Sequence, residues 1–237
     1  VLPFQFFKTE QASKIFSVSE CGTKYLKSKF PKWSNKFHTC YLGVKDNGRG
    51  KFSLEDEFTI VSCSGFSENK RVRLIAELFS QFPFKARWIH FGDHGIQKEG
   101  VLQIVNSLPE FLKVEFKGEV PNRELIRFYS ENTVNLFVNL SKVEGIPVSL
   151  MEAGMAGIPL VATDTFGNSE IVNVNTGLLL SQHDIYFKEI ISFAEKLKSS
   201  NDFQLNLRQT TRAFCVNYFD SIKNNSKFIS QLLDFPN

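Results

Sequence analysis

Cysteine is scarce in this chain of 237 residues, and the few cysteines present lie far apart. The four occupy positions 21, 40, 63 and 215, with no Cys-x-x-Cys pair. Zinc sites use closely spaced thiolates, so this spacing argues against a zinc site and favours buried, reduced thiols. Reduced thiols are typical of a reducing compartment, and we therefore expect a cytoplasmic protein.

Long apolar runs and a leading signal are also missing. No apolar run reaches the ~18 residues of a membrane-spanning helix. No charged segment followed by an apolar one opens the chain, as it would in a signal peptide. The sequence begins with Val1-Leu2-Pro3 rather than methionine, which predicts a fragment without its natural N-terminus.

A strong excess of one charge is absent as well. The chain has 28 Lys and Arg against 25 Asp and Glu, a net charge of +3. This is too small to predict a nucleic-acid partner. It suits an anionic substrate, or a peripheral association with anionic lipid on the cytoplasmic face of the inner membrane. Phenylalanine, in contrast, is abundant at 25 residues, which predicts a core filled with aromatic rings.

Short β-branched or aromatic runs alternate with stretches of helical periodicity. The expected strands are Ile15–Ser19, Cys40–Val44, Phe58–Ser64, Arg87–Gly92, Val114–Gly118, Leu136–Leu140, Leu160–Thr163 and Gly177–Leu180. Strands separated by helices predict βαβ units. The fold class is therefore α/β, with a parallel sheet and helices on both faces. The chain after Gly177 is expected to be mostly helical, with helix starts at Asp184 and at Asn201–Asp202.

Residues 45–57 interrupt this alternation. They hold most of the local charge and two glycines, Gly48 and Gly50. Such a composition is typical of a linker, and it predicts that the first 44 residues are separate from the main domain.

The segment after the expected strand Leu136–Leu140 carries the strongest functional signal. It reads Ser-Lys-Val-Glu144-Gly-Ile-Pro-Val-Ser-Leu-Met-Glu152. In an open parallel sheet, ligands bind beyond the carboxyl ends of the strands, where the strand order reverses. Glu144 stands just before an expected helix and Glu152 lies one to two turns inside it, so both could face one cleft.

The residues between the two glutamates suit an anion site. Gly145 permits a tight turn that a side chain would obstruct, and Pro147 suits the first turn of a helix. The free amides of Ile146, Val148 and Ser149 would then offer a positive helix end to a diphosphate. Two glutamates eight residues apart also occur by chance, and Glu152 alone could be a solvated helix residue. The ordered combination favours a site.

The segment Glu144–Asp164 resembles the paired-glutamate signature of the retaining GT-B glycosyltransferases, also called glycosyl transferases group 1 or family 4. This family includes enzymes of capsule, exopolysaccharide and lipopolysaccharide synthesis. The similarity continues through residues 166–172 and 175–179. Upstream, Val61–Arg71 is similar to the family's first strand and phosphate loop, Trp88–Asp93 to its second strand, and Val114–Pro121 to the loop at the nucleotide base.

The resemblance implies a division of the chain. Residues 58–217 would form the Rossmann-like nucleotide-sugar-binding domain, the C-terminal domain of a GT-B enzyme. Residues 1–44 would be the end of the N-terminal acceptor domain, with 45–57 as the linker. Residues 218–237 would form the helix that crosses back to the first domain.

The resemblance also implies two catalytic residues, Glu144 and Lys70. Glu144 would bind hydroxyls of the transferred sugar and support charge near the reacting carbon. Lys70 would neutralise the departing diphosphate. The other interpretation of Lys70 is a solvated lysine at a helix start.

The implied donor-binding residues are Gly65, Glu119, Val120, Gly145, Ile146, Pro147, Val148 and Glu152. Amides around Ile146 to Val148 would hold the sugar and distal phosphate, and Glu152 would accept hydrogen bonds from the ribose. Backbone at Glu119 and Val120 would read the base. No metal or other cofactor is expected, since a lysine and a helix end can offset the diphosphate charge.

The chain departs from the family at Gly65. The family commonly has an arginine five residues before the lysine, and glycine cannot offer that bidentate fork to phosphate. Arg71 and Arg73 are the nearest candidates to replace its charge. Phe166 likewise stands where the family has a glycine. His90, within a strand, is expected in the core, and His94 is expected to be an exposed loop residue.

Three functions fit this sequence. The favoured one is a retaining hexosyltransferase that uses a UDP- or GDP-sugar and a glycan or lipid-linked acceptor in cell-surface polysaccharide synthesis. A cleft with one wall cannot align two reactants, so the isolated chain could be inactive. The second is a catalytically silent nucleotide-sugar-binding or partner-binding module that lacks the acceptor domain. The third is epimerisation or phosphorolysis on the same fold, although the cofactor-lysine motif of a phosphorylase is missing.

Overall fold

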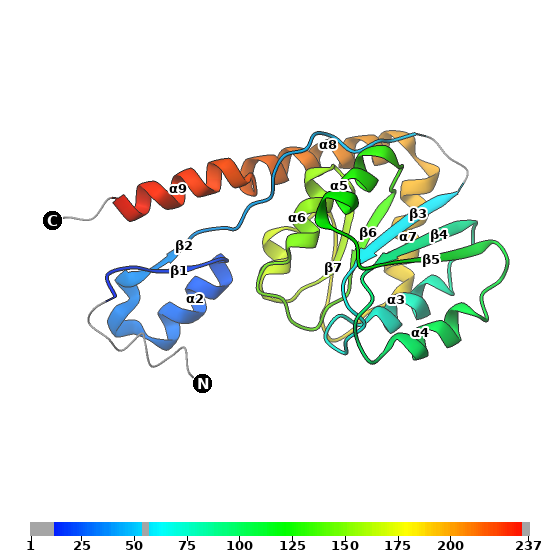
Figure 1. Cartoon of the computed structure of the whole chain (residues 1–237), viewed down its shortest axis with the longest axis horizontal. Coiled ribbons are helices and arrows are strands. Elements are labelled where there is room, and N and C mark those ends of the chain that lie inside the picture. The colour runs from blue at the N-terminus through cyan, green and yellow to red at the C-terminus, as the bar shows by residue number, and fades with distance from the viewer. Residues whose placement is uncertain (1–11, 54–56, 234–237) are drawn as a thin grey trace.

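The computed structural model describes residues 12–53 and 57–233. Its larger part is a six-stranded sheet with the order β5-β4-β3-β6-β7-β8 (Figure 1). The strands are β3 (Phe58–Cys63), β4 (Ala86–Phe91), β5 (Leu112–Gly118), β6 (Leu136–Asn139), β7 (Leu160–Thr163) and β8 (Gly177–Leu180). Every neighbouring pair is parallel. This confirms the α/β fold with a parallel sheet.

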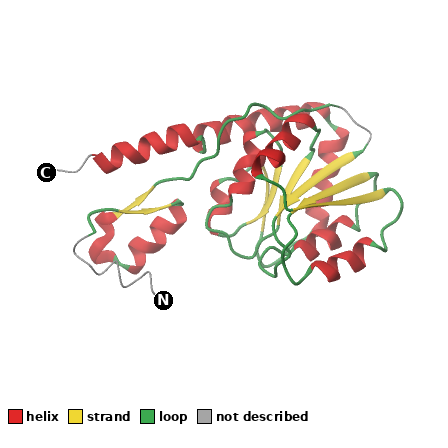
Figure 2. Cartoon of the chain, viewed as in Figure 1, coloured by secondary structure: helices red, strands yellow, loops and turns green. Residues whose placement is uncertain are grey.

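Helices cover both faces of this sheet (Figure 2). Each face has its own hydrophobic core. One face is covered by α3 (Val72–Phe79), α4 (Lys98–Val105) and α7 (Phe187–Ser199); the other by α5 (Asn122–Glu131), α6 (Val148–Met155) and the second half of α8 (Asn201–Tyr218). Successive strand residues point to opposite faces, so Ile60 joins the first core and Val61 the second. No helix within the described ranges combines the length and the apolar character needed to span a bilayer.

Aromatic rings fill much of the first core, as the phenylalanine content predicts. Phe58, Phe66, Phe79 and Trp88 are all buried there. The rings of Phe79 and Trp88 lie 6.1 Å apart between centroids, a separation typical of packed aromatic pairs.

A smaller unit precedes the sheet. Strand β1 (Ile15–Ser17) pairs in parallel with β2 (Phe37–Thr39), and α2 (Glu20–Lys29) and the 3₁₀ helix η1 (Pro31–Lys36) connect them. Helix α9 (Ser221–Leu233) continues from α8 and reaches this unit (Figure 1). There the ring of Phe228 meets that of Phe16 edge-on at 5.0 Å. Residues 45–53 contain no helix or strand, and residues 54–56 of the expected linker lie outside the described residues.

The strand expected at Cys40–Val44 is wrong, because the strand ends at Thr39. Val44 pairs instead with the junction of α8 and α9: its amide donates to the Phe219 carbonyl at 2.9 Å, and its carbonyl accepts from the Ser221 amide at 3.0 Å. An apolar connector that pairs with a remote segment has the same sequence pattern as a strand.

Of the two expected helix starts, one is confirmed. Helix α8 begins at Asn201, where the Ser200 hydroxyl accepts from the Phe203 amide at 3.3 Å and caps the helix. Helix α7 begins at Phe187, so the expected start at Asp184 is wrong.

Candidate functional site

The strand order of the main sheet reverses between β3 and β6. Strands β4 and β5 continue on one side, and β7 and β8 on the other. The loops after β3 and β6 therefore lead to opposite faces and leave a crevice between them, the usual ligand position in such a sheet. Both segments singled out in the sequence, residues 64–71 and 140–147, follow these two strands.

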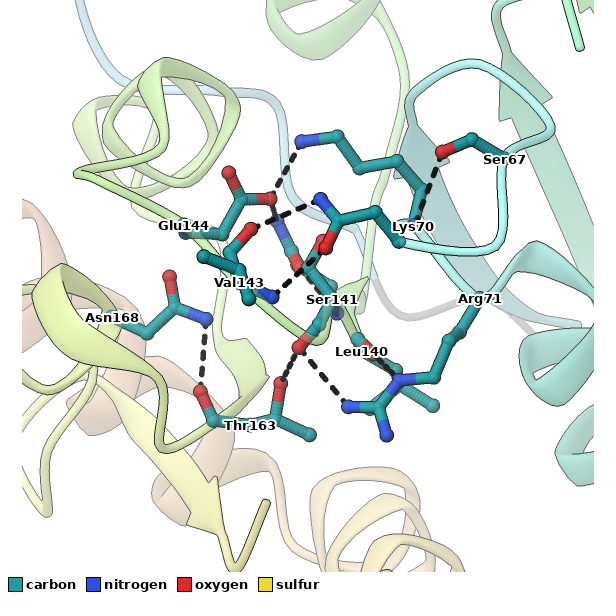
Figure 3. Close-up of polar contacts among 11 residues, drawn as sticks. Ser67, Lys70, Arg71, Leu140, Ser141, Val143, Glu144, Thr163 and Asn168 are labelled. Carbon is teal, nitrogen blue, oxygen red and sulfur yellow. Dashed lines mark hydrogen bonds and ion pairs between the residues drawn. The ribbon is translucent and has the colours of Figure 1, made fainter. Parts of the chain in front are cut away.

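Lys70 and Glu144 meet across this crevice (Figure 3). Lys70 Nζ lies 2.6 Å from Glu144 Oε1, and Asn139 Nδ2 donates to the same oxygen at 3.4 Å. The Glu144 side chain is 10% exposed and that of Lys70 is 32% exposed. The pair is thus partly shielded from water, and its charges interact more strongly than those of an exposed ion pair. The two residues expected to be catalytic lie together.

Asn69 joins the two loops that carry this pair. Its side-chain amide donates to the Val143 carbonyl at 3.0 Å, and its Oδ1 accepts from the Val143 amide at 3.0 Å. Its backbone carbonyl accepts from the Lys142 amide at 2.8 Å. Three hydrogen bonds from one residue fix the Glu144 loop relative to the Lys70 loop. The sequence gives no signal for Asn69, since its side-chain partner is 74 positions away.

Arg71 and Arg73, the nearest candidates to replace the missing arginine, both bind other groups of the chain. Arg71 Nε donates to the Leu140 carbonyl and its Nη2 to the Ser141 carbonyl at 3.0 Å (Figure 3). Burial lowers the pKa of this guanidinium. Arg73 Nε lies 3.0 Å from Glu77 Oε1 on an exposed face of α3. The Arg71 guanidinium thus binds carbonyls of the loop that follows β6, and that of Arg73 binds Glu77, so a role of either arginine in replacing the missing phosphate charge stays a prediction.

Helix α6 begins at Val148, directly after Pro147, with no side chain capping its amides. The amides of Val148 and Ser149 therefore keep donor capacity at the positive end of the helix. The chain bends at Gly145, but a side chain there would not be obstructed, because a Cβ would meet no atom within 4 Å; the steric reason expected for this glycine is therefore wrong. The close approach occurs instead at Gly167, whose Cβ would overlap the Gly145 carbonyl. Gly145 itself faces open space.

An open cleft of about 440 Å³ lies beside this helix end. It contains five of the expected donor-binding residues, Gly65, Glu119, Val120, Val148 and Glu152. The remaining lining residues are Cys63, Ser64, Phe91, Gly92, His94, Asn122, Leu125 and Ser149. Lys70 and the segment 144–147 are not part of this lining. The described residues contain no group of three or more His, Cys, Asp or Glu side chains placed to hold a metal ion.

Glu152 is buried in the wall of this cleft, with 9% of its surface exposed. Its Oε1 accepts a hydrogen bond from Asn122 Nδ2 at 2.6 Å. Burial raises the pKa of the Glu152 carboxyl, and the bond from Asn122 partly offsets this. Glu152 is therefore not a solvated helix residue. Asn122 could not be selected from the sequence, because an asparagine at a helix start is common.

His90 is a core residue, as predicted. It is fully buried, and its Nδ1 lies 2.8 Å from the Ser62 hydroxyl, which accepts from Trp88 Nε1 at 2.8 Å. Burial lowers the pKa of His90 from 6.5 to about 4.

The low pKa of His90 predicts acid sensitivity. Between pH 6.5 and 4 the unfolded chain takes up a proton at this position and the folded chain does not. The stability that the neutral His90 contributes is thus fully present above its pKa in the unfolded chain, and it is lost as the pH falls toward its pKa in the folded chain. We expect the free energy of unfolding to fall by about 2 kcal/mol between pH 7 and pH 5 because of His90. Urea unfolding of the chain and of a His90→Asn variant would measure it, because only the difference in pH slope belongs to His90. Equal slopes would contradict the prediction.

The model of the family described as glycosyl transferases group 1 matches residues 44–212. The chain belongs to this family. Two curated relatives from Escherichia coli, the O-antigen biosynthesis glycosyltransferase WbnH and the probable O-antigen biosynthesis glycosyltransferase WbiN, are each 29% identical over 134 residues. The alignment covers 56% of this chain and 36% of each relative. This glycosyl transferases group 1 chain thus spans little more than a third of their length.

Solved structures share the fold at low sequence identity. Anabaena Alr3699/HepE in complex with UDP has a TM-score of 0.80 at 17% identity, over 94% of this chain and 64% of that one. TarM has a TM-score of 0.77 at 17% identity, over 95% of this chain and 45% of that one. These similarities agree with a GT-B fold for this glycosyl transferases group 1 member.

Proposed function

We propose that this chain is the donor-binding part of a retaining, paired-glutamate hexosyltransferase of family 4. The donor is a UDP- or GDP-sugar, and the acceptor is a glycan or lipid-linked glycan in cell-surface polysaccharide synthesis. One observation carries the proposal: Lys70 and Glu144 pair at the point where the strand order reverses, beside the uncapped start of α6. The similarity to WbnH and the UDP bound to HepE support it.

The arrangement assigns different residues to four parts of the donor: the diphosphate, the sugar, the ribose and the base. The amides at the start of α6 and the ammonium of Lys70 offset the charge that grows on the departing diphosphate. Glu144, across from Lys70, accepts hydrogen bonds from sugar hydroxyls. Glu152 accepts from the ribose through the oxygen that Asn122 leaves available. Backbone at Glu119 and Val120, at the far side of the cleft, contacts the base.

The proposed function also assigns the parts of the chain. Residues 58–217 bind the donor, 1–44 belong to the acceptor domain, 45–57 link the two, and 218–237 return to the first domain. The protein works in the cytoplasm, with peripheral contact to the inner membrane through which it reaches a lipid-linked acceptor.

The ribose role predicts the behaviour of a Glu152→Ala variant. It should bind UDP or GDP about 10- to 100-fold more weakly, the loss of a hydrogen bond to a charged group. Calorimetry with the nucleotide and with its 2′,3′-dideoxy form tests this: the wild-type chain should distinguish the two ligands, and the variant should not. Glu131→Ala, an exposed glutamate on α5, is the matched control. Equal affinity of Glu152→Ala and the wild-type chain would end the ribose assignment.

Gly65 favours a second candidate, a catalytically silent nucleotide-sugar-binding module. A Cβ at this position would lie 2.6 Å from the His94 carbonyl, so the loop as folded has no room for the family's arginine. Release of hexose from a UDP- or GDP-hexose by the chain, or by a longer form of the protein, would exclude this candidate. Binding without release in both forms would favour it.

A further inference from the structure

The proposed donor brings at least two negative charges to a cleft with few basic groups. Of the described residues that line the cleft, one has a basic side chain, His94. Two others are acidic, Glu119 and Glu152. Lys70 lies outside this lining and pairs with Glu144. A positive group within the cleft would therefore add to the compensation of the diphosphate charge that Lys70 and the start of α6 provide.

His94 lies against the backbone at Gly65. A Cβ on Gly65 would be 2.6 Å from the His94 carbonyl and 3.2 Å from Cδ2 of its ring. The His94 carbonyl also accepts from the Phe66 amide at 2.6 Å. The imidazole thus occupies space beside the residue at which the family's arginine would begin.

Two more glycines allow the loop after β4 to lie against the loop after β3. Gly92 has φ 114° and Gly95 has φ 134°, conformations that favour glycine. A Cβ on Gly92 would overlap the Ser64 carbonyl, and one on Gly95 would overlap the Phe66 carbonyl. The position of His94 is therefore built into the contact between the two loops and does not result from a single side-chain rotamer.

The His94 side chain is 79% exposed, as the sequence predicts for a loop residue, and one contact orients its ring. Its Nδ1 pairs with the carboxylate of Glu119, at the side of the cleft assigned to the base. A protonated imidazole donates through both nitrogens. One can hold Glu119, and Nε2 remains for a second acceptor. No described residue forms a hydrogen bond with Nε2.

We propose that His94 binds a phosphate oxygen of the nucleotide diphosphate and supplies, from the loop after β4, the positive charge that Gly65 cannot. This inference rests on the proposed donor site. It makes His94 a donor-binding residue, and it gives a chain with glycine at position 65 a source of positive charge for a diphosphate.

The test is calorimetry with UDP, GDP and the matching nucleosides, uridine and guanosine. His94→Ala should lower the affinity for the nucleoside diphosphate about tenfold, since one charge-assisted hydrogen bond is lost. The affinity for the nucleoside should stay within about twofold of the wild-type value. His94→Lys, which restores a cation on the same loop, should recover most of the diphosphate affinity. Lys113→Ala is the control, because it removes an exposed positive charge near the start of β5, at the opposite end of the sheet from the cleft.

The outcomes separate this inference from the proposed function. If the wild-type chain binds neither UDP nor GDP, the donor site itself is wrong. If the wild-type chain binds and His94→Ala binds equally well, the donor site stands and the role of His94 is overturned. Equal weakening of nucleotide and nucleoside would also overturn it, because His94 would then contact the base or the ribose.

Discussion

Replacing Arg208 with alanine is expected to lower the free energy of unfolding by about 3–5 kcal/mol. Arg208 is fully buried. Its Nη1 donates to the Val134 carbonyl at 2.7 Å, its Nη2 donates to the Lys51 carbonyl at 3.2 Å, and its guanidinium carbon lies 5.0 Å from the centre of the Phe52 ring. One side chain on α8 therefore joins Lys51 and Phe52 to the residues just before β6. The alanine variant loses this packing and leaves both carbonyls without a donor.

The effect of lost packing on stability can be separated from the effect of the lost charge. Burial lowers the pKa of Arg208 to about 10, which shows that desolvating this cation has a cost. Arg208→Met keeps much of the volume and removes that cost, so it should destabilise the chain by less than Arg208→Ala. Arg127→Ala, in an exposed pair on α5, should change stability by less than about 0.5 kcal/mol.

Chemical unfolding at pH 7 measures all three variants. For a chain of this size, the expected loss for Arg208→Ala corresponds to a fall in Tm of roughly 6–20 °C. A change as small as that of Arg127→Ala would show that the guanidinium does not hold the segment 45–53 in place.

The sheet could be predicted from the sequence because its strands are buried on both faces. Runs such as Leu136–Asn139 are almost wholly apolar and are bounded by turn residues, and few structures other than a buried strand have this pattern. The carboxyl-end rule then places residues 140–152 at the crevice without any knowledge of side-chain contacts. The expected strand at Cys40–Val44 failed because this segment is also apolar, and its partner Phe219 is remote in the sequence.

The side-chain partners in the site could not be predicted in the same way. Asn69, Asn122 and Arg208 look like ordinary polar residues at helix starts or on helices, and their contacts lie 30 or more positions away. Gly65 is the clearest case. In the sequence it is the loss of an arginine, whereas in the structure it permits the contact with His94. Whether a glycine removes a group or makes room for one depends on its neighbours in space.

Replacing Lys70 with alanine should have the largest effect on the proposed donor site. We expect UDP or GDP to bind up to about 100-fold more weakly, because in the proposed site the ammonium forms a charge-assisted contact with the diphosphate inside a partly shielded crevice. Uridine or guanosine should bind within about twofold of the wild-type affinity. Calorimetry with each pair of ligands measures both effects. If nucleoside and nucleotide weaken alike, Lys70 does not act on phosphate.

Glu144 provides the decisive companion variant, because in this structure it pairs with the Lys70 ammonium that we propose contacts the diphosphate. Glu144→Gln keeps the shape of the side chain and removes its charge, so Lys70 is released from a competitor. UDP alone should then bind as tightly as before or a few-fold more tightly. A UDP-hexose should lose the extra affinity that its sugar contributes, since the carboxylate no longer accepts from the sugar hydroxyls. If instead UDP and UDP-hexose weaken equally, Glu144 acts only by positioning Lys70. A Lys70→Ala/Glu144→Gln double variant that is no weaker than Lys70→Ala would then identify the ion pair as the functional unit.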